Sequence, residues 1–135
     1  MAKQKIQIIV RCMLEQDGKT LLLKRTKLKG GNYGLAGGHV DPGETPSAAV
    51  IRELKEEIGV KIKAKHLRLH KTIYREKGDL QNLHLIFQAK KWKGEPQNLE
   101  PRLCKHIGWY ELAALPKNLS PTTKATFQKD ALYVE

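Results

Sequence analysis

The stretch GHVDPGETPSAAVIRELKEEIGV, residues 38–60, contains clear helix signals and the most unusual charge pattern of this chain. Thr45 is suited to cap a helix, Pro46 to occupy its first position, and Gly59 to adopt the left-handed conformation that ends it. These signals predict a helix over residues 46–58. The face of this helix that packs against the protein would consist of Ile51, Leu54 and Ile58.

Three glutamates of this helix, Glu53, Glu56 and Glu57, lie at positions i, i+3 and i+4. This spacing puts their carboxylates on one face, which we expect to be exposed and opposite the packing face. Like charges so placed repel one another and stabilise a fold only when a cation lies among them. Carboxylate oxygens are ligands that Mg²⁺ or Mn²⁺ accepts, together with substrate phosphates. The helix is therefore a candidate metal site.

The residues around the three glutamates fit the same chemistry. Gly37 and Gly38 let the backbone approach a metal or a phosphate where a Cβ would obstruct. Glu44 precedes the helix, near its positive end, and can face the same cation. Arg52 can pair with a neighbouring carboxylate and hold it in one rotamer.

Outward from this helix, the chain reads as alternating strands and turns. Residues 6–14 and 20–26 are predicted to form a hairpin and residues 28–34 a surface loop. A short extended piece is predicted between Gly37-Gly38 and Asp41-Pro42-Gly43. Further strands are predicted over residues 67–75, 83–92 and 107–110, and a second helix from Pro121 to about residue 131. This order predicts a mixed β-sheet sandwiched between helices, in the α/β or α+β class.

The composition limits the class of protein. The 135 residues suffice for one domain, so we expect residues 1–135 to form a single domain. A hydrophobic content of 40% and a charged content of 29% are ordinary for a globular protein. No apolar run approaches the roughly 20 residues needed to span a bilayer, so no membrane is expected. Two cysteines make no disulfide framework, which favours the reducing cytoplasm. The oligomeric state cannot be read from the sequence.

The charge predicts an anionic partner. Lys and Arg number 25 against 14 Asp and Glu, a formal net charge of +11. Residues 61–77 alone hold seven basic side chains and one acidic side chain. A nucleotide, a nucleic acid or a membrane headgroup would each match this charge, and a solvated basic surface without a partner is an equal alternative.

The spacing of residues 38–60 resembles the signature of the Nudix hydrolases at every fixed position. That pattern is Gly, five residues, Glu, seven residues, then Arg-Glu-apolar-any-Glu-Glu-any-Gly-apolar. The resemblance implies a Nudix fold and the metal-dependent hydrolysis of a nucleoside diphosphate linked to another group. It implies Glu56 and Glu57 as metal ligands, Glu53 as ligand or base, and a backbone carbonyl near Gly37 as a further ligand.

A weaker resemblance links the chain to the MutT-type members, which hydrolyse oxidised guanine nucleotides such as 8-oxo-dGTP. Trp92-Lys93-Gly94-Glu95-Pro96 is followed by Glu100 at the offset of that subgroup's additional ligand or base. Asn118, before the second predicted helix, resembles the residue that reads the purine edge, and Arg25 resembles a cation near base and phosphates. His39 stands where the subgroup often has Lys and could touch a phosphate. Ala36 stands where a Pro is common.

Three functions remain open at this point. A nucleoside triphosphate, cut to a monophosphate and pyrophosphate, is the favoured substrate. ADP-ribose or a dinucleoside polyphosphate is the alternative substrate within the same reaction class. The third reading is a nucleotide- or RNA-binding module, which the complete set of glutamates disfavours because loss of catalysis in such domains usually removes them.

Overall fold

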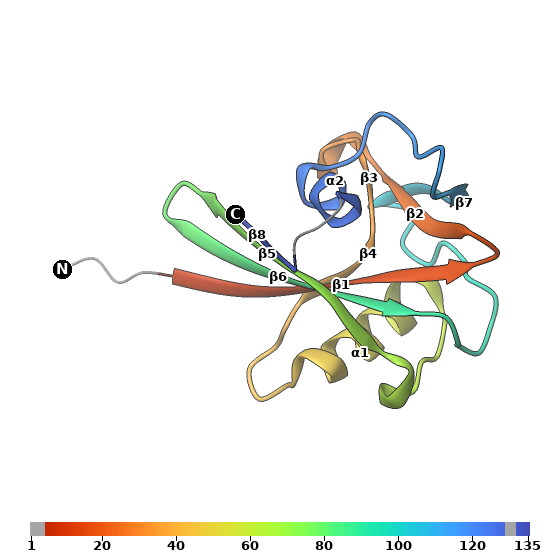
Figure 1. Ribbon diagram of the computed structural model, residues 1–135, viewed down its shortest axis with the longest axis horizontal. Helices are drawn as coiled ribbons and strands as arrows, with labels where there is room; N and C mark the ends of the chain where they lie inside the picture. Colours follow the sequence, from red (N-terminus) through yellow and green to blue (C-terminus); the bar gives the residue numbers. More distant parts are fainter. Residues whose placement is uncertain (1–4, 129–131) are drawn as a thin grey trace.

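The computed structural model describes residues 5–128 and 132–135, which form a mixed sheet with helices on both sides (Figure 1). Its strands are β1 (Lys5–Gln16), β2 (Lys19–Arg25), β3 (Tyr33–Gly34), β4 (Ala36–His39), β5 (Arg68–Lys77), β6 (Leu80–Ala89), β7 (Cys104–Glu111) and β8 (Tyr133–Val134). Its α-helices are α1 (Pro46–Ile58) and α2 (Pro121–Phe127), and its short 3₁₀ helices are η1 (Lys27–Lys29) and η2 (Ala64–His66).

Strand β1 organises the sheet because it pairs with three other strands. Along its length it runs parallel to β6, and on its other side residues 9–12 run antiparallel to β4. Its last residues turn into β2, which in turn pairs with β3 and β7. The strand order is β3-β2-β1-β6-β5-β8, with β4 on β1 and β7 on β2.

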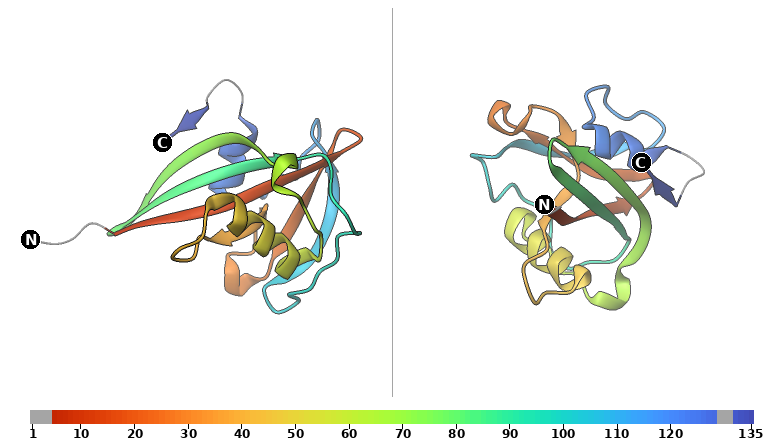
Figure 2. Two further views of the ribbon diagram at one scale, coloured as in Figure 1. Left: turned by 90° about the horizontal axis from the view of Figure 1, so that it is seen from below. Right: turned by 90° about the vertical axis from the view of Figure 1, so that its left-hand side faces the viewer.

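The two helices cover opposite faces of this sheet (Figure 2). The α1 side holds a cluster that joins Val10, Cys12 and Leu14 of β1 to Val50 and Leu54 of α1. The α2 side holds a second cluster, made of Met13, Leu22, Leu35, Ile73, Ile86 and Ala125. The predicted mixed sheet between helices is therefore confirmed, because successive residues of β1 point to opposite faces and each face needs a cover.

Helix α1 has the predicted ends. Thr45 accepts a hydrogen bond from the backbone N–H of Ala48 through its side chain, Pro46 is the first helical residue, and Gly59 ends the helix at φ 72°. The predicted packing face is wrong in detail, because Ile51 is only half-buried. The buried residues of α1 are Ala49, Val50, Leu54, Glu57 and Ile58.

Other boundaries differ from the prediction for reasons of tertiary structure. Helix α2 ends at Phe127, since Gln128 is extended, and residues 129–131 of the predicted helix lie outside the described residues. Strand β6 ends at Ala89 instead of residue 92, because residues 90–93 turn toward the segment after α1. The predicted loop 28–34 ends in β3, whose pairing with β2 is non-local. Strand β8, which pairs with β5, was not predicted.

Among the described residues, no helix combines the length and the apolar character that crossing a membrane requires.

Candidate active site on helix α1

Arg52 joins three acidic side chains, one from the loop before α1 and two from α1 itself, into one network. Its Nε and Nη2 donate to the two carboxylate oxygens of Glu44, at 2.8 and 3.0 Å. Its Nη1 donates to Glu53 at 3.0 Å and to Glu56 at 3.3 Å. Nη2 also donates to the backbone carbonyl of His39 at 3.0 Å. The predicted pairing of Arg52 with neighbouring carboxylates is present, and its planar fork holds the loop before α1 against the helix.

This network lowers the pKa of Glu44 to about 2. The main cause is the hydrogen bonding from Arg52, followed by the bond that the Asp41 backbone N–H donates at 3.0 Å. A depressed carboxyl pKa stabilises the fold above the pKa of the unfolded chain. That stability is lost as the pH falls from about 4.5 through about 2.

We expect the substitution Arg52→Lys to raise the pKa of Glu44 from about 2 toward its ordinary 4.5, because an ammonium cannot donate to both oxygens at once. Carboxyl-detected NMR titration measures this pKa directly. Arg68→Lys is the matched control, since Arg68 is exposed on β5. An unchanged Glu44 titration in Arg52→Lys would contradict the role given to the guanidinium.

Two glycines of β4 bring the helix close to β1. A Cβ at Gly37, where φ is 154°, would lie 1.9 Å from the carbonyl oxygen of Val10. A Cβ at Gly38 would lie 2.5 Å from a carboxylate oxygen of Glu53. Gly37 therefore permits the pairing of β4 with β1, and Gly38 makes room for the Glu53 side chain.

Glu57 lies in a different environment from the other glutamates. It is only 8% exposed, and its Oε2 has no hydrogen-bond partner among the described residues. Nη2 of Arg25 lies 3.7 Å from this oxygen. Burial raises the pKa of Glu57 to about 7, although Arg25 and then Arg11 act in the opposite direction. The prediction that all three glutamates lie on an exposed face is therefore wrong for Glu57.

Arg11 is a site residue that the sequence analysis did not identify. It lies on β1 and donates to the backbone carbonyl of Leu35 at 3.3 Å, and Arg25 donates to the same carbonyl at 3.2 Å. The sequence did contain a clue to this role, because Arg11 is the only charged residue within the otherwise apolar residues 8–14. Two guanidinium groups that converge beside a buried carboxylate form a polar site able to hold an anion.

The loop that carries Glu100 is attached to the end of α1. The backbone N–H groups of Gln97 and Leu99 donate to the carbonyls of Ile58 and Glu57, at 2.9 and 3.0 Å. These bonds satisfy carbonyls that a helix end leaves without partners. They bring Glu100 near enough to reinforce the raised pKa of Glu57. Gly59 has its predicted role as the residue that lets the chain turn here.

The remaining predicted residues lie further from the glutamates. The exposed Asn118 accepts from the Tyr33 backbone N–H and donates through its side-chain amide to the carbonyl of Gly31 at 3.2 Å. The imidazole of His39 lies 3.4 Å from the Gln7 side chain on the surface, so only the backbone of His39 takes part in the Arg52 network. A cavity of about 180 Å³ joins the arginines to the α2 side; its lining includes Arg11, Arg25, Tyr33, Ser120 and Thr123.

In residues 5–128 and 132–135, no three carboxylate, imidazole or thiolate side chains converge closely enough to hold a metal ion. The reason is visible in the ion pairs, since Arg52 draws Glu53 and Glu56 to itself while Arg25 faces Glu57. Rotation of the exposed Glu56 side chain and of Glu53 away from Arg52 would be needed to gather the oxygens.

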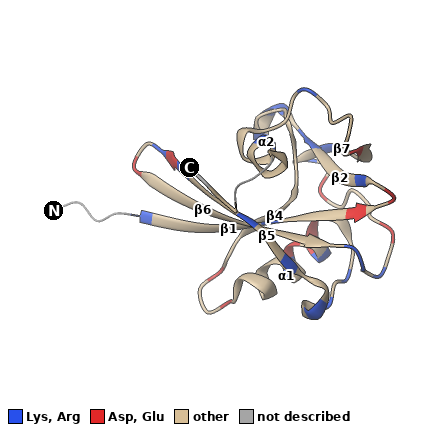
Figure 3. Cartoon of the chain, viewed as in Figure 1, with Lys and Arg blue, Asp and Glu red and all other residues tan. Residues whose placement is uncertain are grey.

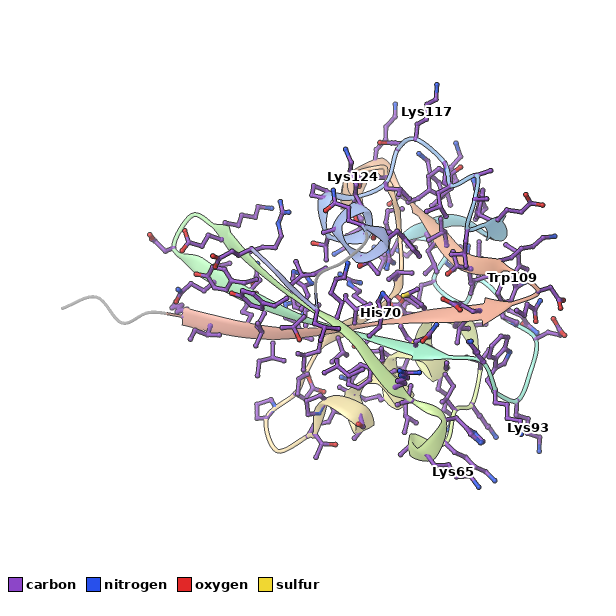
Figure 4. The ribbon with its side chains drawn as sticks, viewed as in Figure 1. Lys65, His70, Lys93, Trp109, Lys117 and Lys124 are labelled. Atoms are coloured by element: carbon purple, nitrogen blue, oxygen red, sulfur yellow. The ribbon has the colours of Figure 1, made fainter. Side chains whose placement is uncertain are left out.

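A larger cavity lies elsewhere. It has a volume of about 740 Å³ and is lined by residues of β5 and α2, among them Leu69, His70 and Phe127. His70, labelled in Figure 4, lies 3.3 Å from the backbone carbonyl of Thr126. None of the predicted site residues lines this cavity.

Comparisons with known proteins identify the family and the fold of the chain. The model of the NUDIX domain family matches residues 4–131. The 8-oxo-dGTP diphosphatase of Escherichia coli (strain K12) is 29% identical over 99 residues, which span 72% of this chain and 75% of that protein. The crystal structure of a MutT NUDIX hydrolase from Burkholderia pseudomallei superimposes with a TM-score of 0.85 at 28% identity, covering 91% of this chain and 96% of that one.

A longer relative matches over more of this chain. The NAD-capped RNA hydrolase NudC of Escherichia coli O157:H7 is 31% identical over 112 residues, which are 83% of this chain. The match spans 42% of the length of that relative.

Proposed function

The chain belongs to the NUDIX family and is a hydrolase of nucleotide derivatives, and we propose that the glutamates of α1 act on the pyrophosphate linkage of a nucleoside triphosphate. The products would be a nucleoside monophosphate and pyrophosphate. The observation that carries the proposal is the buried Glu57 carboxylate, one oxygen of which has no hydrogen-bond partner among the described residues, beside two arginines and next to a helix face with two more glutamates.

The donor set fits a divalent cation. A buried carboxylate oxygen without a hydrogen-bond partner is costly unless a cation or a proton compensates it. Glu53, Glu56 and Glu57 supply hard oxygen atoms, which suit Mg²⁺ or Mn²⁺, and Glu100 and the carbonyl of Gly37 are further candidate ligands. A divalent ion bound by these residues would neutralise charge on phosphate oxygens and lower the pKa of a bound water.

Other residues of the chain would bind the phosphates, transfer a proton and hold the catalytic groups in position. Arg11 and Arg25 would bind phosphate oxygens and orient the linkage toward the glutamates, since guanidinium groups match phosphate geometry. Glu53 accepts a hydrogen bond from Arg52 and lies against Gly38. It is a candidate base that takes a proton from water. Glu100 is the alternative base, on the loop fixed to the end of α1. Glu44 and Arg52 act as positioning residues for the others.

Support for a triphosphate comes from the E. coli 8-oxo-dGTP diphosphatase, which the chain matches over three quarters of that protein's length. ADP-ribose and dinucleoside polyphosphates remain the alternative substrates. The two cysteines, Cys12 and Cys104, are free and buried, and burial raises the pKa of Cys12 to about 12. We infer from these thiols a reducing, cytoplasmic location.

A panel of nucleotides tests the proposed reaction. The panel contains canonical and oxidised nucleoside triphosphates, ADP-ribose and a dinucleoside tetraphosphate, each with Mg²⁺, and the assay measures pyrophosphate and orthophosphate separately. Release of pyrophosphate from a triphosphate at the highest kcat/KM supports the proposal. Turnover of ADP-ribose alone, or orthophosphate as the first product, would overturn the triphosphate assignment.

We expect Asn118→Ala to weaken selection among bases by about tenfold in the ratio of kcat/KM values. The reason is that an amide both donates and accepts, and a site that pairs with a base edge discriminates by about 1–3 kcal/mol. Steady-state kinetics with purine and pyrimidine triphosphates measures the ratio, and Lys117→Ala in the same loop is the control. An equal loss for every nucleotide would instead assign Asn118 to holding the loop at Gly31.

A further inference from the structure

Six exposed lysines lie in the two segments that follow α1 and β6, at one corner of the molecule (Figure 3). They come from two segments, residues 61–65 and 90–93. This lysine patch consists of Lys61, Lys63, Lys65, Lys90, Lys91 and Lys93.

Backbone pairing forces the two segments together. The N–H and carbonyl groups of Lys61 exchange two hydrogen bonds of 2.9 Å with those of Lys93, as in an antiparallel bridge. On the first segment Ile62 is buried in the core, so the lysines at alternate positions project to solvent. The patch is therefore a property of the fold and joins residues that are far apart in the sequence.

The like charges of the patch are not compensated within the described part of the chain. Lysines directly opposite each other on paired strands repel. None of the six forms an ion pair with an acidic side chain among the described residues. The positive charges of the patch also act on His66. The pKa of His66 is lowered mainly by burial and, after that, by Lys65, Lys91 and Lys63. Such a surface gains stability when an anion binds to it.

A hollow with an aromatic wall adjoins the patch. It has a volume of about 420 Å³, and its lining includes Lys90, Lys91 and Trp92. The ring of Trp92 stacks on that of Trp109, with 5.9 Å between centroids and 18° between planes. Glu95 also lines the hollow but, among the described residues, forms no ion pair with the lysines. Figure 4 shows Lys65 and Lys93 at the lower right of the molecule and Trp109 above them, whereas Lys117 and Lys124 lie at the top.

We propose that the lysine patch and the adjoining hollow bind single-stranded nucleic acid, with the lysines on the phosphodiester backbone and a base in the hollow beside Trp92. A positive surface next to aromatic side chains is the combination that holds single strands without sequence preference. A membrane is the less suitable partner, because the large apolar side chains that are exposed lie outside residues 61–66 and 90–93. A duplex would offer phosphates to the lysines but no free base to the hollow. None of the candidate catalytic glutamates, Glu53, Glu56, Glu57 and Glu100, lines the hollow, so this inference goes beyond the proposed hydrolysis.

Binding is measured without hydrolysis, by fluorescence anisotropy of labelled 15-nucleotide RNA and DNA strands in EDTA. The patch variant combines Lys63→Gln, Lys65→Gln and Lys93→Gln. The matched control removes the same charge elsewhere, through Lys77→Gln, Lys117→Gln and Lys124→Gln. We expect the patch variant alone to bind on the order of 10- to 100-fold more weakly at 0.1 M salt, and its log–log salt slope to fall by about 2. Equal losses in the two variants would overturn the proposal, since they would show only a response to net charge.

The tryptophans report where the strand binds. Trp92 and Trp109 are the only two tryptophans of the chain and border the proposed surface. We expect their fluorescence to change on addition of an unlabelled single strand, with the same midpoint as the anisotropy. Binding without any such change would contradict the proposed surface. A duplex of the same sequence and vesicles of anionic phospholipid complete the test, and tighter binding of either than of the single strand would also overturn it.

Discussion

The substitution Glu57→Gln is expected to lower kcat on the preferred nucleotide by on the order of a thousandfold while making the metal-free protein more stable. The loss of activity follows from the removal of an anionic ligand whose charge a bound cation needs, worth several kcal/mol in the transition state. Glu56→Gln should lower kcat to a similar degree. Glu111→Gln, an exposed glutamate at the end of β7, is the control and should keep full activity.

The gain in stability follows from the raised pKa of Glu57. Because the folded state holds its proton up to about pH 7 and the unfolded chain only to about 4.5, the wild type loses stability as the pH rises through this window. The neutral amide removes that loss. Urea unfolding in EDTA should show Glu57→Gln equal to the wild type below about pH 4.5 and more stable above pH 7, by at most about 3 kcal/mol.

Comparison of Glu57→Gln with Glu56→Gln distinguishes the effect of losing a metal ligand, seen in kcat, from the effect on the free energy of unfolding. Glu56 is 54% exposed through its side chain, so its substitution should leave the free energy of unfolding nearly unchanged at every pH. Turnover close to that of the wild type in Glu57→Gln or Glu56→Gln would refute the ligand role of that residue. A stability difference that does not vary with pH would refute the raised pKa.

The substitution Gly37→Ala is expected to destabilise the protein by more than about 3 kcal/mol. Its Cβ would lie 1.9 Å from the carbonyl oxygen of Val10 and 2.8 Å from the Cα of Arg11, and both are backbone atoms in the middle of β1. Relief would require β4 to separate from β1, with loss of the pairs from Ile9–His39 to Cys12–Ala36. Urea unfolding followed by circular dichroism measures the effect.

Gly38→Ala is the neighbouring control. The atoms nearest to its Cβ would be those of the Glu53 carboxylate, the far end of a flexible side chain. We expect this variant to keep most of its stability and to lose turnover, because Glu53 is displaced from the position in which Arg52 holds it. Similar stability in the two alanine variants would show that the separation of β4 from β1 is not the governing effect.

The local features of the site were predicted well from the sequence. Thr45, Pro46 and Gly59 specify the ends of α1 through contacts within one turn, so no other part of the fold is needed. The pairing of Arg52 with carboxylates was predicted for the same reason, since Glu53 and Glu56 lie one and four residues away. The bidentate bond to Glu44 completes this local network.

Features that depend on distant segments were missed or misplaced. The burial of Glu57 depends on how α1 is rotated against β1 and β4, and half-buried Ile51 shows that helical periodicity gave this rotation only approximately. Arg11 reaches the site because its side chain donates to the carbonyl of Leu35, to which Arg25 also donates. The end of α2 and the strand β8 likewise depend on contacts with segments that are distant in the sequence.

The helix, its caps and the set of carboxylates follow from the amino-acid sequence alone, because spacings of three or four residues along one element set them. Three features follow only from the folded chain: which glutamate is buried, which arginines face it, and the meeting of two lysine segments in one patch. These outcomes depend on strand pairing and on the packing of a helix on a sheet, and such contacts join residues with no local relation in the sequence.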